Sequence, residues 1–240
     1  MKFFFLLIIF STLLPQPSLA KEGQEIIFDR YILKNTTYTS QLQLKAKRIF
    51  QETFPDCVEK LAYVRLKPTI IVPANFTVSD DPEDIQNLDF NDLHPSFGQW
   101  VEHARINGCD EKTTINILAT ANDAQLVPVL FPLVNGTTKV EIKHQSIAEK
   151  NVSDAVATNT DCSDPGIVLG TEIIGYLAPG GNRLAETDQQ AGWFEKWVIE
   201  ACAKEYTVNL AALPDPRTQY RYIAEFKTES DDTKEETADN

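Results

Sequence analysis

The order of hydrophobic and polar positions along the chain predicts two helices, each followed by a group of strands. The first helix is expected to begin at the capping box of Ser40 and Gln43, with an apolar face made of Leu42, Ala46, Ile49 and Phe50. A second capping box, Ser146 and Glu149, predicts a helix whose apolar face is made of Ala148, Val152, Ala155 and Val156. A short polar stretch and a cysteine follow each helix.

After each helix, apolar and polar residues alternate with the period of two that is typical of half-buried strands. In the first part of the chain the predicted strands cover residues 61–72, 99–107, 113–121 and 127–134. In the second part they cover residues 167–177, 193–199, 206–213 and 220–226. The aromatic residues and alanines of 193–203 also fit a helix, which is the alternative for that segment.

Part of this pattern occurs twice, at a constant separation of 93 residues. At that separation, residues 100–123 match residues 193–216 at seven of 24 positions, namely Trp100, Glu102, Ile106, Cys109, Thr114, Asn116 and Ala119. Average composition would produce about one or two identities. We interpret the match as an internal duplication, against the alternative of a coincidence between two amphipathic hairpins.

These elements predict an α+β fold of two tandem pseudo-repeats, each a helix packed on a small antiparallel sheet. The expected divisions are a signal peptide over 1–20, a first repeat over 21–135, a second repeat over 136–227 and a disordered acidic tail over 228–240. Four cysteines allow three disulfide pairings. Because equivalent cysteines should have equivalent partners, we favour Cys57 with Cys109 and Cys162 with Cys202.

The N-terminal residues have the three-part layout of a secretory signal peptide. Lys2 gives a positive start, residues 3–14 are almost wholly apolar, and small residues precede a cleavage point after Ala20. The apolar run is shorter than the roughly 20 residues that span a bilayer. In an exported chain an even number of cysteines favours disulfides, and no C-x-x-C pair indicates zinc or redox chemistry. We therefore expect a soluble periplasmic or secreted protein with no membrane span after the signal peptide.

The net charge of the chain limits the classes of molecule that it can bind. The formal net charge of −13 disfavours binding to a nucleic-acid backbone and to an anionic membrane surface. A protein or peptide partner fits better, and the sequence indicates no cofactor.

Few patterns point to catalysis or metal binding. Acidic and amide side chains gather in one stretch, at Asp80, Asp81, Glu83, Asp84, Asp89, Asn91 and Asp92. The spacing and the glycine of a calcium loop are missing, so a solvated loop is favoured. The three histidines, His94, His103 and His144, are scattered along the chain. His103 follows Glu102, but neighbours on a strand point to opposite faces and cannot form a dyad.

The duplicated motif supplies the candidate site residues. Glu102 and Glu195 occupy equivalent positions beside tryptophans, and two carboxylates facing one cleft would suit glycoside hydrolysis. A structural role in a cross-strand pair is the favoured alternative. The motif also gives a candidate groove for a sugar or peptide, made of Trp100, Glu102, Trp193, Glu195 and Trp197. Core packing is the favoured alternative, because aromatic residues on a half-buried strand usually lie in the core.

The two motifs, HPSFGQWVE followed by NGC at residues 94–109 and GWFEKW followed by a cysteine at residues 192–202, resemble a group of uncharacterised exported bacterial proteins. The similarity covers both W-x-E…Cys hairpins. This chain departs from that pattern at Asp110 and Ala203, where glycine is expected after each cysteine. The resemblance implies a periplasmic, non-catalytic protein and no particular ligand.

The sequence thus favours a non-enzymatic periplasmic or secreted protein that binds a protein or peptide partner or assists envelope assembly. One alternative is an envelope hydrolase that uses Glu102 and Glu195. The other is a secreted, host-facing effector, which only release into the medium would distinguish from the first hypothesis.

Overall fold

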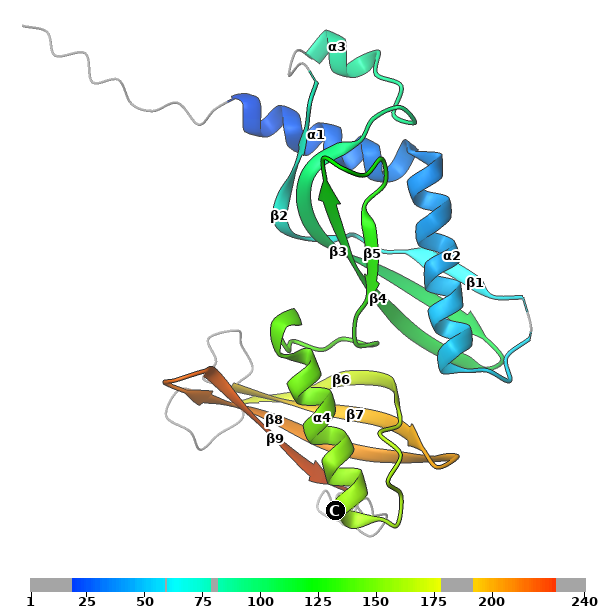
Figure 1. Ribbon diagram of the computed structural model, residues 1–240, viewed down its shortest axis with the longest axis vertical. Helices are drawn as coiled ribbons and strands as arrows, with labels where there is room; N and C mark the ends of the chain where they lie inside the picture. The colour runs from blue at the N-terminus through cyan, green and yellow to red at the C-terminus, as the bar shows by residue number, and fades with distance from the viewer. Residues whose placement is uncertain (1–18, 59, 79–81, 178–191, 228–240) are drawn as a thin grey trace, which may run out of the picture.

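The computed structural model describes residues 19–58, 60–78, 82–177 and 192–227. These residues form two α+β halves, one above the other in Figure 1, joined by a connecting segment over residues 133–141. The expected boundary between residues 135 and 136 falls inside that segment. Most of the predicted signal peptide and the whole predicted acidic tail lie outside the described residues.

The first half packs helices on one face of an antiparallel sheet. Its helices are α1 (Leu19–Lys34), α2 (Thr36–Thr53) and the short α3 (Pro82–Gln86). Its strands are β1 (Ala62–Arg65), β2 (Thr69–Phe76), β3 (Pro95–Gly108), β4 (Glu111–Asn122) and β5 (Val129–Pro132). The long strand β3 pairs with both β1 and β2 along one edge and with β4 along the other, and β5 pairs with β4.

The second half has the same plan in a simpler form. One helix, α4 (Ile142–Asn159), lies over a four-stranded antiparallel sheet. The strands follow the chain in the order β6 (Ile167–Leu177), β7 (Gly192–Ala201), β8 (Lys204–Asp215) and β9 (Gln219–Phe226). The strand interpretation of residues 193–199 is therefore confirmed over its helical alternative. The separation of 93 residues carries both ends of β4 onto both ends of β8.

Both predicted helices begin earlier than their capping boxes suggest. α2 begins at Thr36, because the Asn35 side chain accepts a 2.8 Å hydrogen bond from the Tyr38 backbone N–H and so caps the helix. Ser40 and Gln43 lie inside the helix. α4 likewise begins at Ile142 rather than Ser146.

The sequence pattern did not predict two structural features of the first half. α1 was not predicted, yet Ile27, Phe28, Tyr31 and Ile32 are all buried on one of its faces. The acidic side chains of the stretch at 84–92 are exposed, as expected of a solvated loop. The sequence did not predict that Ile85, Phe90 and Leu93 are buried and anchor this stretch. Asn35 also donates a 2.7 Å hydrogen bond to the Phe90 carbonyl, which ties this stretch to the start of α2.

The disulfides pair as the duplicated pattern predicts. Cys57 bonds to Cys109 and Cys162 bonds to Cys202, with Cα–Cα distances of 5.6 and 5.9 Å. Each bridge ties the segment that leaves a helix to the hairpin turn at the far end of the sheet. Loops of this length make each bridge worth about 4 kcal/mol through the entropy of the unfolded chain.

The two disulfide-bearing hairpins turn through residues in the left-handed region. Cys109 and Asp110 have φ values of 52° and 66°, and Cys202 and Ala203 have 50° and 57°. Two adjacent residues with positive φ make the tight turn whose twist matches that of the strands. Glycine suits the second position because it has no Cβ, so the departures at Asp110 and Ala203 are mildly strained.

We predict that Ala203→Gly raises the free energy of unfolding by about 1 kcal/mol, since glycine adopts this turn without steric cost. Urea unfolding followed by circular dichroism measures the change. The control is Ala211→Gly, inside β8, which should instead lower stability by about 0.5–1 kcal/mol. A loss of stability in Ala203→Gly would contradict the strain argument.

Candidate functional site

The five residues of the predicted groove are core residues. Trp100, Glu102, Glu195 and Trp197 are fully buried, and Trp193 is 6 % exposed. They lie on the sheet faces that the helices cover, because alternate residues of β3 and β7 point inward. These residues therefore do not form the candidate groove. They take the favoured structural role, in two buried carboxylate centres, one in each half.

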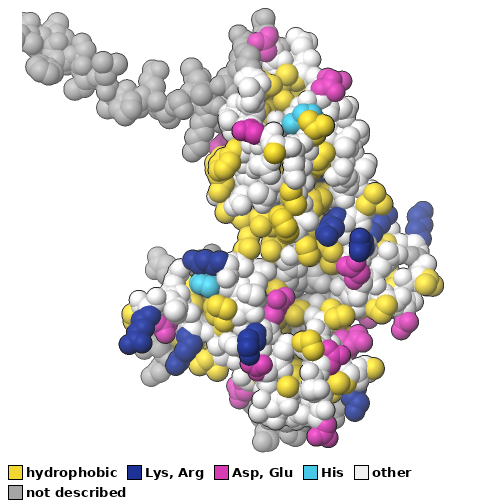
Figure 2. Space-filling model, viewed as in Figure 1, with side chains coloured by type: hydrophobic (Ala, Val, Ile, Leu, Met, Phe, Trp, Pro, Cys, Tyr) yellow, Lys and Arg dark blue, Asp and Glu magenta, His cyan; other side chains and the backbone are white. Residues whose placement is uncertain are grey.

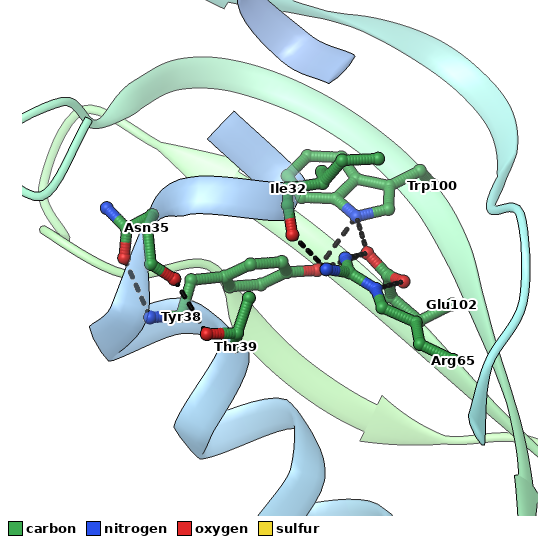
Figure 3. Close-up of polar contacts among 7 residues, drawn as sticks. All are labelled: Ile32, Asn35, Tyr38, Thr39, Arg65, Trp100 and Glu102. Atoms are coloured by element: carbon green, nitrogen blue, oxygen red, sulfur yellow. Dashed lines mark hydrogen bonds and ion pairs between the residues drawn. The ribbon is translucent and has the colours of Figure 1, made fainter. Parts of the chain in front are cut away.

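In the first half, Glu102 is held by three different side chains (Figure 3). Its Oε1 accepts hydrogen bonds from Tyr38 Oη at 2.7 Å and from Trp100 Nε1 at 2.8 Å. Arg65 pairs with both carboxylate oxygens, with a distance of 2.9 Å from Nε to Oε2. Arg65 also donates to the Ile32 carbonyl near the end of α1. One carboxylate thus joins β3 to β1 and to both long helices.

The protonation states of Tyr38 and Arg65 are set by burial and by their contacts with Glu102. Burial and the adjacent Glu102 carboxylate raise the pKa of Tyr38 well above its ordinary value, so Tyr38 remains a neutral donor. Burial lowers the pKa of Arg65, but its hydrogen bonds with Glu102 outweigh that effect and raise the pKa. Arg65 therefore stays a cation, and its guanidinium faces both oxygens of the buried Glu102 side chain.

In the second half, Glu195 accepts four hydrogen bonds from neutral donors. Trp193 Nε1 and Trp197 Nε1 donate from the same strand, at 2.7 and 2.8 Å. Thr138 Oγ1 donates at 2.8 Å and the Lys139 backbone N–H donates at 2.7 Å, both from the connecting segment. A buried carboxylate with its oxygens saturated in this way is a structural anion. Here it ties β7 to the chain that enters α4.

The two glutamates therefore share a structural role rather than a cleft. Each is sealed beneath the helix of its own half and is fully hydrogen-bonded. Paired acid–base work needs both carboxylates to face one substrate, and this arrangement does not provide that geometry. The glutamate of each W-x-E motif instead joins the sheet to the chain at the N-terminal end of the helix that covers it.

An open groove lies on the other face of the first sheet, where it meets the chain entering α4. Its volume is about 760 Å³. Apolar side chains from both halves and the connecting segment line most of it: Ile71, Val101, Leu118, Leu133, Val140 and Ile142. Figure 2 shows hydrophobic side chains gathered on this part of the molecule, over the lower end of the first half beside the junction.

A chain of three polar side chains crosses the floor of this groove. His103 Nδ1 lies 2.7 Å from Asn116 Oδ1, and His103 Nε2 lies 3.0 Å from Thr69 Oγ1. His103 and Asn116 are opposite residues of β3 and β4, and all three side chains line the groove. Glu102, the neighbour of His103 in the sequence, points to the opposite face of β3 and is not its partner. The cross-strand register, which a single sequence does not reveal, supplies the actual partners.

The remaining candidate residues do not assemble into a metal site. Within the described ranges, no three or more His, Cys, Asp and Glu side chains are placed to hold a metal ion. His144 lies 3.3 Å from Tyr222 Oη, in the second half and away from His103.

The connecting segment holds the two sheets together through backbone bonds. The Gly136 N–H donates to the Thr114 carbonyl at 2.7 Å, and the Thr137 N–H donates to the Thr171 carbonyl at 2.9 Å. Gly136 has a φ of 98°, and a Cβ at this position would lie 2.3 Å from the backbone of Thr171. Glycine is therefore required where the segment passes between the sheets.

Comparison with known proteins gave no relative: no family model matches the chain, and neither does any curated protein or solved structure. No helix of the described part combines the length and the apolar character needed to cross a bilayer.

We predict that Glu195→Gln lowers the free energy of unfolding by about 3 kcal/mol. The glutamine amide would replace one of the two accepting oxygens by an NH2 group, which would face an indole N–H and one further donor that now bond to that oxygen. Urea unfolding monitored by tryptophan fluorescence measures the loss. Glu200→Gln, on the outward-facing side of the same strand, is the control and should change stability by no more than about 0.5 kcal/mol. Equal effects of the two substitutions would show that Glu195 does not fasten the second half.

Proposed function

We propose that this protein acts outside the cytoplasm by binding an extended segment of a partner protein in the groove between its two halves. The observation that carries the proposal is the groove itself, a mostly apolar hollow of about 760 Å³ on the face of the first sheet that its own helices leave uncovered. Pockets of this size and character are the usual sites of recognition.

The edge of the sheet explains why an extended segment fits best. In the described part of the chain, β2 pairs with β3 alone, and the side chains of Thr69, Ile70 and Ile71 at its start are exposed. At the other end of β2, the Gln24 amide already imitates a strand partner. It accepts from the Phe76 N–H at 2.8 Å and donates to the Phe76 carbonyl at 3.4 Å. A peptide added along β2 would pair with its backbone and place alternate side chains in the groove.

The compartment belongs to the same proposal. Two disulfides are typical of exported proteins, and the N-terminal sequence has the layout of a signal peptide. Duplication of an α+β unit would account for the matching disulfides, hairpins and buried glutamates of the two halves. We place the protein in the periplasm or the external medium, where an edge strand can meet unfolded or extended partners.

Selection of a displayed random peptide library on the pure protein tests the binding site. We expect enrichment of peptides that alternate apolar and polar residues, and hydrogen exchange should slow in β2 when they bind. Ile71→Asp should weaken the selected peptides at least about tenfold, because it places a charge in the apolar groove.

Leu126→Asp is the matched control, since Leu126 is 70 % exposed and does not line the groove. It should leave peptide affinity unchanged. Peptides that bind both variants as tightly as the parent protein would place the site elsewhere, and a library with no enriched sequence would remove the proposal.

A further inference from the structure

We propose that Thr69, His103 and Asn116 form a nucleophile, a general base and a positioning residue, and that the groove can accept an acyl group on the Thr69 hydroxyl. The inference goes beyond the binding function and does not depend on it, because it concerns chemistry at one hydroxyl. It replaces the sequence-based hydrolase hypothesis, whose two glutamates are buried in separate halves.

The orientation of Asn116 fixes the tautomer of His103. Asn116 Nδ2 donates to the carbonyls of Val134 and Gly136, at 2.8 and 2.9 Å. Both partners are acceptors, so the amide nitrogen must face them and Oδ1 must face the imidazole. Oδ1 can only accept, and His103 Nδ1 therefore carries the proton. The lone pair of Nε2 then points at Thr69.

Thr69 meets two requirements of a nucleophile, since its hydroxyl lies next to a base and is exposed to solvent. Its Oγ1 lies 3.0 Å from His103 Nε2, within the hydrogen-bond distance over which a base can take a proton. Thr69 is exposed at the edge of the sheet, whereas His103 is half-buried and Asn116 is buried behind it. The order from solvent inward is nucleophile, base and orienting amide, which is the arrangement of known acyl-transfer triads.

The reaction is transfer of an acyl group from an ester. Thr69 Oγ1 attacks the ester carbonyl carbon while its proton passes to His103 Nε2. The bond from that carbon to the alcohol oxygen breaks, and the departing oxygen takes the proton from Nε2. Water, activated by the same nitrogen, then hydrolyses the acyl-threonine and releases the acid. Protons and electron pairs balance with water as the second reactant.

The rest of the groove defines the substrate class. Its apolar walls suit an aliphatic or aromatic acyl chain. Two donors line the same groove, the Lys143 ammonium, which pairs with Glu141 at 2.8 Å, and the Gln99 amide, which lies 3.5 Å from Thr120 Oγ1. Either group would have to leave its present partner to stabilise the negative charge that develops on the carbonyl oxygen. Esters of apolar acids are thus the compounds that this site would take.

The test uses p-nitrophenyl butyrate and the folded, oxidised full-length chain. Release of p-nitrophenol is recorded, and peptide mass spectrometry locates any butyryl group. The wild-type protein should show a butyryl group on Thr69. Thr69→Ser should keep the adduct, and Thr69→Val should abolish it. His103→Gln should slow acylation at least about a hundredfold, because the base is lost.

Thr114→Val is the matched control, since Thr114 lies on the same face of β4 but in a different cross-strand pair. It should leave the labelling of Thr69 unchanged. No butyryl group on Thr69 in the wild-type protein, or equal labelling in His103→Gln, would reduce the three residues to a cross-strand hydrogen-bond chain. Circular dichroism of each variant separates loss of chemistry from loss of fold, and Thr69→Val changes only an exposed side chain.

The role of Asn116 needs a separate readout. Nitrogen NMR of the His103 ring reports which nitrogen carries the proton, and we expect protonation at Nδ1 in the wild-type protein. Asn116→Ala should shift the ring toward the Nε2 tautomer and slow acylation of Thr69. An unchanged tautomer in a folded Asn116→Ala variant would overturn the positioning role.

Discussion

The structure depends on one constraint, namely that each half buries a glutamate whose two oxygens must both find hydrogen-bond donors. A carboxylate away from water is stable only if its oxygens are fully hydrogen-bonded. Glu102 meets this requirement with a tyrosine, a tryptophan and an arginine, and Glu195 with two tryptophans, a threonine and a backbone N–H. In the first half the donors come from the sheet and from the first turn of α2, and in the second half they come from the sheet and from the chain that enters α4. The hydrogen bonds to each carboxylate therefore fix the position of the helix on its sheet.

This constraint also decides where function can lie. The inward face of each sheet is occupied by a helix and a saturated carboxylate, and the groove that we propose for binding and for chemistry lies on the outward face of the first sheet, at the junction. There the connecting segment pairs with β4 on one side and β6 on the other, and Gly136 lets it pass between them. The groove and its Thr69–His103–Asn116 chain lie at this junction. A stable inward anion and an open outward groove are thus two consequences of the same strand alternation.

The sequence correctly predicted those features of the fold that depend on the local hydrophobic pattern and on the similarity between the two halves. The α+β class, the strands around both hairpins and both disulfides follow from alternation and from the 93-residue match. It missed α1, whose apolar face lies directly after a segment interpreted as a signal peptide. It left two roles open for the five motif residues, a candidate groove and the favoured role in the core, because a tryptophan beside a glutamate looks the same in both. Only the burial of these side chains in the folded protein distinguishes a core residue from a binding residue. Only the pairing of β3 with β2 and β4 shows that Thr69 and Asn116 lie next to His103.

The central claim can be tested in one experiment, because the chain has three tryptophans and the indole N–H of each donates to a buried glutamate. Proton NMR in water and deuterium oxide would measure exchange of the three indole N–H groups in the oxidised protein. The account predicts that all three exchange only through global unfolding, as slowly as the most protected backbone amides of β3 and β7. Exchange of any one at the rate of free tryptophan, in the folded protein, would show that its glutamate is not the buried anchor described here.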